Sequence, residues 1–357
     1  MRLLVDLSTF TSDHNGGKDE VAYNLLKGFS QLQLTQSIVC VSRDELVEKV
    51  KAIDKGYYVV PISRITCRTR FSPLISAIPD VVYAKKLNKV IKDEHIDAVL
   101  YTNKFVPPVK LNVPTIVVPH DIQPLTIYKS DRSIYPMCAA IMTKNTLSVC
   151  DHIIAISDFE KKSALENNIC KNEKIEVIFN GVDVRKYYKN KNHYKITRSS
   201  LGIPDDAYVY GMVGRLSKQK APDIFIKFAM MIKKQMENAF FIIVGDGEDR
   251  KEIENLIKEY KLDNNVIITG WVDDPMEYIK LFDQAFLLSR WEGFGLVLTE
   301  YMLAGKPIIA TNVNAIPNLI YDGENGILVE PNNPGAVFEA SNFLYNNNEY
   351  CNKLIEN

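Results

Sequence analysis

Short apolar runs alternate with amphipathic segments along the whole chain. The runs rich in Val, Ile, Leu and Phe are at 2–7, 38–41, 57–60, 97–101, 115–119, 152–156, 175–179, 208–213, 240–244, 266–269, 285–288, 308–310 and 326–329. Most are separated by stretches in which apolar residues recur every three or four positions, as in a helix that buries one face. Strands that alternate with helices form parallel sheets joined by right-handed crossovers. The pattern therefore predicts an α/β fold that ends in a single last helix.

A shift in composition divides the chain into two halves. Residues 184–206 are rich in Lys, Asn and Tyr and contain the turn sequence Gly202-Ile203-Pro204-Asp205. At 357 residues the chain is long enough for two hydrophobic cores. We therefore predict an N-terminal Rossmann-like domain over 1–184, a linker over 185–206 and a C-terminal Rossmann-like domain over 207–357, both doubly wound.

The composition is typical of a cytoplasmic protein. No apolar run approaches the length of a membrane span, and Met1-Arg2 leads into the first predicted strand without a signal peptide. The six cysteines are scattered and form no Cys-x-x-Cys pair, which argues against a disulfide framework or a structural zinc site.

Charge is unevenly distributed between the two halves. Residues 1–190 hold 26 Lys+Arg and 21 Asp+Glu, whereas the remainder holds 17 and 23. Within 64–92, seven basic residues are interleaved with apolar ones, and Asp80 is the single acid. Such a mixture favours contact with an anionic membrane surface, although a solvated helix that covers the sheet gives the same pattern. No nucleic-acid-binding motif occurs, so we expect no nucleic-acid partner.

The segment 289–310 combines two glutamates with a tight turn. Gly293 and Gly295 permit a sharp turn after the strand at 285–288, a helix is expected to start at Leu296, and Glu292 and Glu300 lie before and within that helix. The free backbone N–H groups at such a helix start form an anion site. An acid beside an anion site suits a ligand with both phosphate and hydroxyls, such as a nucleotide sugar. The alternative is that Glu300 faces solvent and Glu292 only favours the helix dipole.

Three further loops are expected at the same sheet edge, because each follows the carboxyl end of a strand. They are Gly214-Arg215 with Lys220, Gly245-Asp246-Gly247, and Gly270-Trp271-Val272. The Arg215 guanidinium suits bidentate binding of a diphosphate, and Lys220 adds a second cation. In dinucleotide folds an acid accepts hydrogen bonds from the ribose hydroxyls, a role that Glu300 would take here. The backbone of the Gly270 loop would meet the base.

Two features of the first half are candidates for the same ligand. Asn15-Gly16-Gly17 separates the first strand from a predicted helix, which is the layout of a phosphate-binding loop but also of an ordinary turn. His120-Asp121 follows the strand at 115–119, at the edge where parallel sheets bind ligands.

These motifs together resemble glycosyltransferase family 4, the retaining enzymes of GT-B architecture, over nearly the whole chain. The strongest marker is Glu-x7-Glu, here Glu292 and Glu300 in E-G-F-G-L-V-L-T-E. Supporting matches are N-G-G at 15–17, H-D at 120–121, N-G-V-D at 180–183, G-R-L-S-K-Q-K at 214–220 and V-G-D-G-E at 244–248. The resemblance implies two Rossmann-like domains that face each other across a cleft.

The resemblance also assigns roles to individual residues. Arg215 and Lys220 would hold the donor diphosphate, Glu300 the ribose, and Glu292 the hydroxyls of the donor sugar. His120 would approach that sugar from the first domain. The remaining residues implied in donor binding are Gly17, Gly214, Gly245, Val272, Gly293, Phe294, Gly295 and Leu296. One departure is Lys220-Ala221, where the family usually has Lys-Gly, and another is that the chain ends soon after its last predicted helix.

The resulting hypothesis is a retaining glycosyltransferase. It would move a sugar from a UDP- or GDP-linked donor to a saccharide or lipid-linked saccharide acceptor in the synthesis of O-antigen, capsule or exopolysaccharide, with a location in the cytoplasm or on the inner face of the membrane. No Asp-x-Asp occurs, so we expect neither a metal ion nor another cofactor. The alternatives are a nucleotide-sugar 2-epimerase of the same fold and a non-catalytic nucleotide-sugar-binding protein. A dehydrogenase is disfavoured because no G-x-G-x-x-G follows the first strand.

Overall fold

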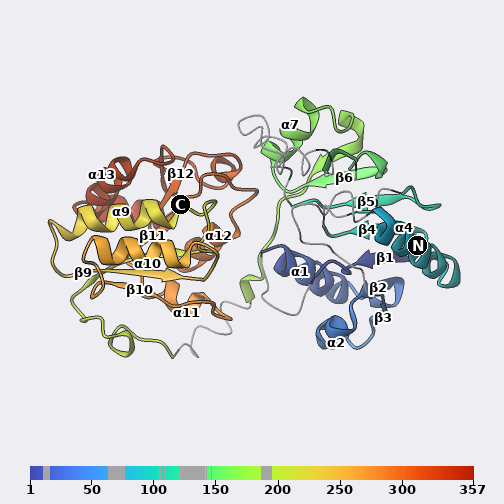
Figure 1. Cartoon of the computed structure of the whole chain (residues 1–357), viewed down its shortest axis with the longest axis horizontal. Helices are drawn as coiled ribbons and strands as arrows, with labels where there is room; N and C mark the ends of the chain where they lie inside the picture. The colour runs from blue at the N-terminus through green and yellow to red at the C-terminus, as the bar shows by residue number, and fades with distance from the viewer. Residues whose placement is uncertain are drawn as a thin grey trace. The chain divides into compact units, whose positions relative to one another are not determined.

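The chain forms two compact units, residues 1–181 and 182–357, each of which is an α/β domain (Figure 1). The computed structural model describes residues 1–10, 17–62, 77–103, 106–107, 109–120, 122, 141, 143–145, 147–185 and 195–357. Much of the basic segment 64–92 therefore lies outside the described residues.

The first unit contains a seven-stranded parallel sheet in the order β3-β2-β1-β4-β5-β6-β7. Its strands are β1 (Leu3–Asp6), β2 (Ile38–Ser42), β3 (Tyr58–Pro61), β4 (Ala98–Tyr101), β5 (Thr115–Val117), β6 (His152–Ala155) and β7 (Ile175–Val177). One core joins the sheet to α4 (Ala77–Asp93) and α7 (Asp158–Glu166). A second core joins it to α1 (Gly17–Gln31) and α2 (Val47–Ile53). Helices therefore cover both faces of the sheet.

The second unit contains a six-stranded parallel sheet in the order β10-β9-β8-β11-β12-β13. Its strands are β8 (Tyr208–Val213), β9 (Ala239–Val244), β10 (Val266–Ile268), β11 (Gln284–Leu287), β12 (Ile308–Thr311) and β13 (Ile327–Val329). One face packs on α9 (Pro222–Lys233), α10 (Arg250–Glu259), α13 (Pro334–Tyr345) and α14 (Asn348–Glu356). The other face packs on α11 (Met276–Ile279) and α12 (Leu296–Leu303).

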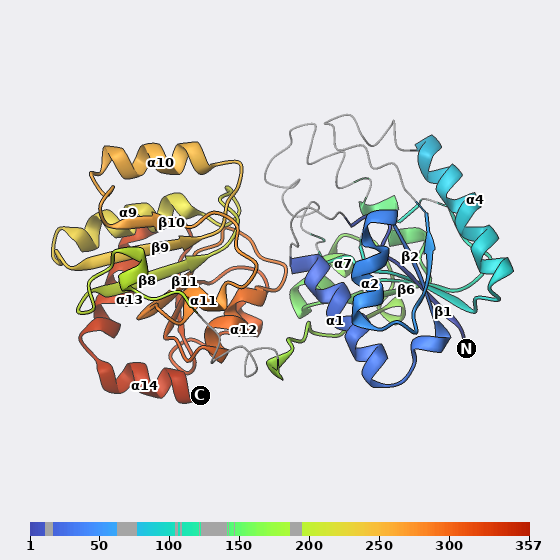
Figure 2. The same ribbon diagram turned by 90° about the horizontal axis from the view of Figure 1, so that it is seen from below.

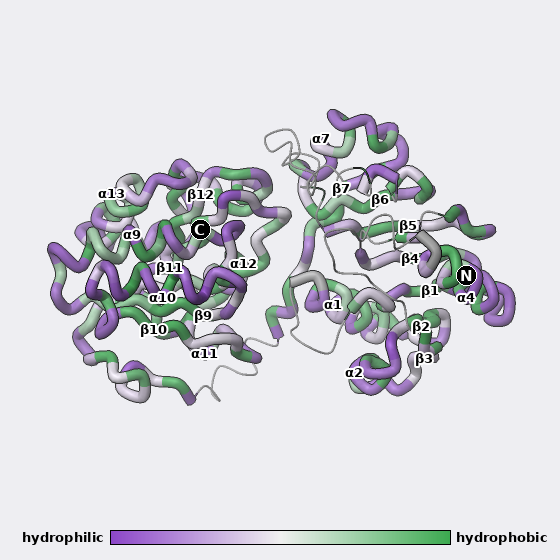
Figure 3. The backbone as a smooth tube through the Cα atoms, viewed as in Figure 1, coloured by the Kyte–Doolittle hydropathy of each residue, from purple (hydrophilic) through white to green (hydrophobic). Residues whose placement is uncertain are grey.

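The layers of the second unit follow from its hydrophobic pattern. Figure 2 shows α9 and α10 on one side of the sheet and α11 and α12 on the other. In Figure 3 the strands β9 and β10 are hydrophobic, whereas α10 is largely hydrophilic. Only Ile253 and Ile257 of α10 are buried, one helical turn apart, so this helix contributes a narrow apolar stripe to the core.

The prediction of two doubly wound Rossmann-like domains is confirmed. The predicted single last helix is wrong, because the segment forms α13 and α14 with a break at Asn346 and Asn347. The side chain of Asn347 caps the second helix by accepting a hydrogen bond from the Tyr350 N–H at 3.3 Å. Asparagine favours such caps over helix interiors, so the Asn run ends one helix and starts the next.

Hydrogen bonds of Arg198 join the segment before β8 to the rest of the second unit. Its guanidinium donates to both carboxylate oxygens of Asp283, at 2.9 and 2.8 Å, and to the carbonyls of Ala207 and Leu281, at 2.9 and 3.0 Å. Asp283 also accepts a hydrogen bond from the Val209 N–H at 2.7 Å. One side chain thus ties the chain entering the unit to the amino ends of two central strands.

We expect Arg198→Ala to destabilise the second unit by about 1–3 kcal/mol, because it removes charge-assisted hydrogen bonds and leaves Asp283 without its cation. Urea denaturation followed by circular dichroism measures the loss. The matched control is Lys195→Ala, since Lys195 is exposed in the same segment. Equal stability of the two variants would contradict the role given to Arg198.

Candidate active site

Two glycine loops of the second unit are held together through their backbones. The Gly214 N–H donates to the Val244 carbonyl at 2.9 Å, and the Leu216 N–H donates to the Asp246 carbonyl at 3.0 Å. A Cβ atom on Gly245 would overlap the Gly214 carbonyl oxygen, and one on Gly247 would overlap the Leu216 carbonyl oxygen. The glycines therefore permit the loops after β8 and β9 to touch, and they place Arg215 at the carboxyl edge of the sheet.

The loop after β11 leads into α12 through Gly295, whose φ of 90° lies in the left-handed region. Tyr301 fixes the helix from within: its hydroxyl donates to the Phe286 carbonyl at 3.1 Å and accepts from the Val213 N–H at 2.8 Å. Complete burial raises the pKa of the Tyr301 phenol, so it stays protonated and can donate. The start of α12 is thereby positioned against β8 and β11.

Glu292 and Lys220 form an ion pair at this edge. Glu292 is 8% exposed, and its carboxylate also accepts a hydrogen bond from the Ser289 hydroxyl at 3.1 Å. Its backbone N–H donates to the Asn314 side chain at 3.2 Å. Two residues that the sequence placed on separate loops are therefore in direct contact.

Arg290, which the sequence analysis did not select, joins the two loops that carry this pair. Its guanidinium donates to the Lys218 carbonyl at 2.7 Å and to Asp223 at 2.8 Å, and its N–H donates to the Gln219 carbonyl at 2.8 Å. The Gln219 amide in turn donates to the Trp291 carbonyl at 3.1 Å. The position of Arg290 beside the Glu-x7-Glu segment was the only sequence signal for this role.

Arg215 differs from Lys220 in its surroundings. Its side chain is exposed, and among the described residues no hydrogen-bond acceptor or carboxylate pairs with its guanidinium. A cation with this exposure can bind an anionic ligand without first breaking an ion pair. Arg215 is therefore the better placed of the two for a diphosphate.

The backbone at Ala221, just after Lys220, is left-handed, with φ 54° and ψ 49°. Glycine adopts this conformation without strain, whereas alanine adopts it at a cost of about 1 kcal/mol. Ala221 is fully buried and directly precedes α9. The departure from Lys-Gly therefore keeps the turn that a glycine would make.

Glu300 and Val272 are two further predicted donor-binding residues; Gly293 and the buried Phe294 lie in the loop before α12, and Leu296 is the first residue of that helix. Glu300 lies in the second turn of α12 and is partly exposed. The side chain of Val272 packs against the core beneath α11 and α12. The backbone of Val272, and not its side chain, is therefore the part suited to meet a base. Gly270 has φ 72°, and the adjacent Trp271 is 46% exposed.

The first unit contains His120 and Gly17. His120 follows β5, is 7% exposed and has φ 59°, in the left-handed region. Gly17 is the first residue of α1. Asn15, Gly16 and Asp121 lie outside the described residues.

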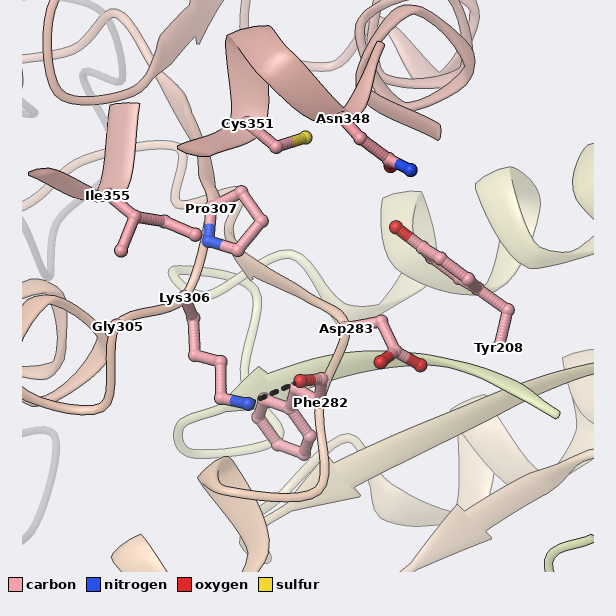
Figure 4. A pocket seen from close by; sticks show the side chains of 9 residues that line it. All are labelled: Tyr208, Phe282, Asp283, Gly305, Lys306, Pro307, Asn348, Cys351 and Ile355. Carbon is pink, nitrogen blue, oxygen red and sulfur yellow. Dashed lines mark hydrogen bonds between the residues drawn. The ribbon is translucent and has the colours of Figure 1, made fainter. Parts of the chain in front are cut away.

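A cavity of about 260 Å³ opens at the opposite edge of the second sheet, under α14 (Figure 4). It is lined by residues at the amino ends of strands, among them Tyr208, Asp283 and Pro307. Lys306 donates from its wall to the carbonyls of Lys280 and Phe282, at 2.9 and 2.7 Å, and burial lowers its pKa. Lys306 therefore satisfies the carbonyls at the end of α11, away from the glycine loops.

The described residues contain neither a cluster of metal ligands nor a helix that could span a membrane. No three His, Cys, Asp or Glu side chains among them cluster closely enough to hold a metal ion. Within the same part of the chain, every helix is too short or too polar to cross a bilayer.

Two family models match the chain, one in each half. The model for Glycosyltransferase Family 4 matches residues 15–186, and the model for Glycosyl transferases group 1 matches residues 194–357.

Two individual relatives are also similar to this chain over part of its length. The UDP-Gal:alpha-D-GlcNAc-diphosphoundecaprenol alpha-1,3-galactosyltransferase of Escherichia coli is 27% identical over 321 residues, which cover 86% of this chain and 79% of that protein. The capsular polysaccharide biosynthesis glycosyltransferase CapM of Staphylococcus aureus is 28% identical over 211 residues, or 58% of this chain and 55% of that protein.

Among solved structures, Anabaena HepE in complex with UDP-glucose is similar over 100% of this chain and 93% of its own, with a TM-score of 0.76 and 20% identity. This likeness shows the fold. Since the two models together span both units, the chain belongs to the family 4 glycosyltransferases and has the GT-B fold.

Proposed function

We propose that the protein transfers a sugar, with retention of anomeric configuration, from a UDP-linked donor to a lipid-linked saccharide during synthesis of a surface polysaccharide. The observation that carries this proposal is that Arg215, the Lys220–Glu292 ion pair and Glu300 all follow the carboxyl ends of the neighbouring strands β8 and β11 in the second unit. The donor and acceptor classes are supported by the names of the E. coli relative and of the HepE complex. A GDP-linked donor is the alternative.

Arg215 and Lys220 would stabilise the departing nucleotide. Cleavage of the sugar–phosphate bond leaves negative charge on the diphosphate, and fixed cations near that charge lower the barrier. Arg215 is exposed and ready to bind, while Lys220 is held in place by Glu292. In this proposal the diphosphate itself removes the proton from the acceptor hydroxyl, so no side chain acts as a covalent nucleophile.

Glu292 would have two tasks that the ion pair couples. It orients the Lys220 ammonium, and its carboxylate, positioned by Ser289, would accept hydrogen bonds from hydroxyls of the donor sugar. The backbone N–H groups of Phe294, Gly295 and Leu296 would assist it at the helix start. Glu300, one turn further along α12, would bind the ribose. His120 completes the proposed set from the first unit.

Glu300→Ala is expected to weaken UDP binding about tenfold or more, because a carboxylate hydrogen bond contributes about 1.5–3 kcal/mol. Glu292→Gln is expected to lower kcat roughly 100-fold with UDP affinity largely kept, since the amide can still contact Lys220. Thermal-shift titrations with UDP and GDP, together with transfer assays, measure both effects.

The control for this pair is Glu339→Ala, an exposed glutamate of α13. If the Glu292 and Glu300 variants lose binding and turnover in the same proportion, their division of labour is wrong. Conversion of the donor to an epimer without acceptor would instead favour the epimerase.

We expect turnover to be independent of divalent metal, because Arg215 and Lys220 would supply the positive charge at the diphosphate. The rate with excess EDTA should stay within about twofold of the untreated rate, whereas Arg215→Ala should lower kcat/KM by roughly 100- to 1,000-fold. Loss of turnover in EDTA that only Mg²⁺ or Mn²⁺ restores would refute this part of the proposal.

The outer face of α4 is the described part of the basic segment 64–92. Its lysines at 85, 86, 89 and 92 are exposed, and Val81 and Val82 beside them are 43% and 49% exposed. Tyr83, Leu87 and Ile91 of the same helix are buried in the core. The acid Asp80 is also buried and does not interrupt the positive face. We propose that this face contacts an anionic membrane surface, where a lipid-linked acceptor would be held.

Replacing Lys85, Lys86, Lys89 and Lys92 with Gln should weaken binding to phosphatidylglycerol-containing vesicles at least about tenfold, since each lysine near such a surface contributes about 1 kcal/mol. Vesicle co-sedimentation at low and physiological salt measures the change. The control replaces four exposed lysines of the second unit, Lys234, Lys251, Lys258 and Lys261. Equal retention of both variants would exclude α4 as the contact.

A further inference from the structure

Three polar residues occupy equivalent positions beyond the carboxyl ends of neighbouring strands in the first unit. In the sheet, Asp6 of β1 is paired with Val41 of β2 and with Tyr101 of β4. Ser8, Arg43 and Asn103 each come two residues after one of these partners. Because neighbouring strands lie about 5 Å apart, the three backbones form a row of roughly 10 Å at this edge.

Hydrogen bonds hold the row together beyond the strands. The Arg43 guanidinium donates to the Ser8 carbonyl at 3.2 Å, and the Thr102 hydroxyl donates to the Asp6 carbonyl at 2.8 Å. The Ser8 N–H donates to the Asp6 carboxylate at 2.8 Å. The chain segment with Asn103 is therefore fixed next to the end of β1, and Arg43 brings a positive charge to the same edge.

Two side-chain oxygens of this row, Ser8 Oγ and Asn103 Oδ1, are buried without a hydrogen-bond partner in the described part of the chain, and Asn103 has the larger polar group. Its side chain is 8% exposed, yet its Oδ1 atom finds no hydrogen-bond partner among the residues that the structure describes. An unpaired amide oxygen in such a place lowers stability by about 1–3 kcal/mol, so packing alone gives no reason for asparagine here. A group that is costly to the fold and lies at the ligand edge of a parallel sheet is a candidate for ligand binding.

We propose that Asn103 binds the acceptor, pairing its side-chain amide with a hydroxyl or acetamido group of the acceptor sugar. This inference rests on the proposed function and adds a residue that determines acceptor specificity. An amide offers both a donor and an acceptor, which matches a sugar hydroxyl or an N-acetyl group. Arg43, about two strand spacings away, pairs loosely with Glu45 at 4.0 Å, and its guanidinium is suited to a phosphate attached to that sugar. The acceptor class is therefore a phosphate-linked saccharide.

The test compares Asn103→Leu with Asn88→Leu. Asn88 lies on α4, away from the sheet edge, and its Oδ1 is likewise buried without a partner in the described part of the chain, so the two residues share an unpaired amide oxygen although Asn88 as a whole is only half-buried. The probe is α-D-GlcNAc diphosphate joined to a decyl chain, titrated calorimetrically into protein saturated with UDP. Melting temperature and UDP affinity are measured on the same samples.

We expect Asn103→Leu to weaken probe binding about tenfold or more, with UDP affinity unchanged and a melting temperature equal to or above that of the wild type. Asn88→Leu should keep probe affinity. Asn103→Ala serves as a second variant if the leucine does not fold, and it should show the same loss of probe binding.

Three results would overturn the inference. They are wild-type probe affinity in the Asn103 variants, an equal loss in the Asn88 variant, and failure of the wild-type protein to bind the probe while it binds UDP. If the protein still binds UDP and turns over the donor in these cases, the proposed function is not contradicted. Absence of both UDP binding and donor turnover would refute the proposed function and this inference together.

Discussion

The Lys220 ammonium and the Glu292 carboxylate meet where both are largely removed from solvent, 72 residues apart in the chain. Such a pair is favourable only if its geometry is fixed and the other polar atoms are satisfied. Ser289 supports the carboxylate, and Arg290 and Gln219 bind the two loops to each other. Lys220 and Glu292 are thus arranged by one network of hydrogen bonds, and the network depends on this pair.

The glycine loops bring the residues of this hydrogen-bond network to the carboxyl edge of the sheet. Gly245 and Gly247 permit backbone contact between the loops after β8 and β9, and Gly295 turns the chain into α12. Tyr301 then anchors that helix to two strands from inside the core. The packing of the core therefore also positions the start of α12, because the side chains that fix the helix set the direction of its first N–H groups.

Sequence alone was sufficient for the strands, the glycine turns and the edge at which the charged residues gather. These follow from local rules: the spacing of apolar residues, the backbone freedom of glycine, and the place where parallel strands end. The contact between Lys220 and Glu292, the clamp made by Arg290, and the hydrogen bond from Glu292 to Asn314 did not follow. They depend on rotamers and loop paths, which bring together residues that no local pattern connects. For the same reason Asn103 could not be identified from the sequence, because its neighbours are known only from the pairing of β1 with β4.

Ala221 shows what a sequence motif specifies. The residue departs from the usual Lys-Gly, yet its backbone keeps the left-handed turn that starts α9. The strain of about 1 kcal/mol is small beside the stability of a folded domain, so the substitution can be carried without loss of the turn. At this position the chain keeps the left-handed backbone conformation of the motif but not its glycine residue. A search for glycine at this position would miss relatives that keep the turn, whereas a search for a left-handed residue seven positions after the glycine equivalent to Gly214 would find them.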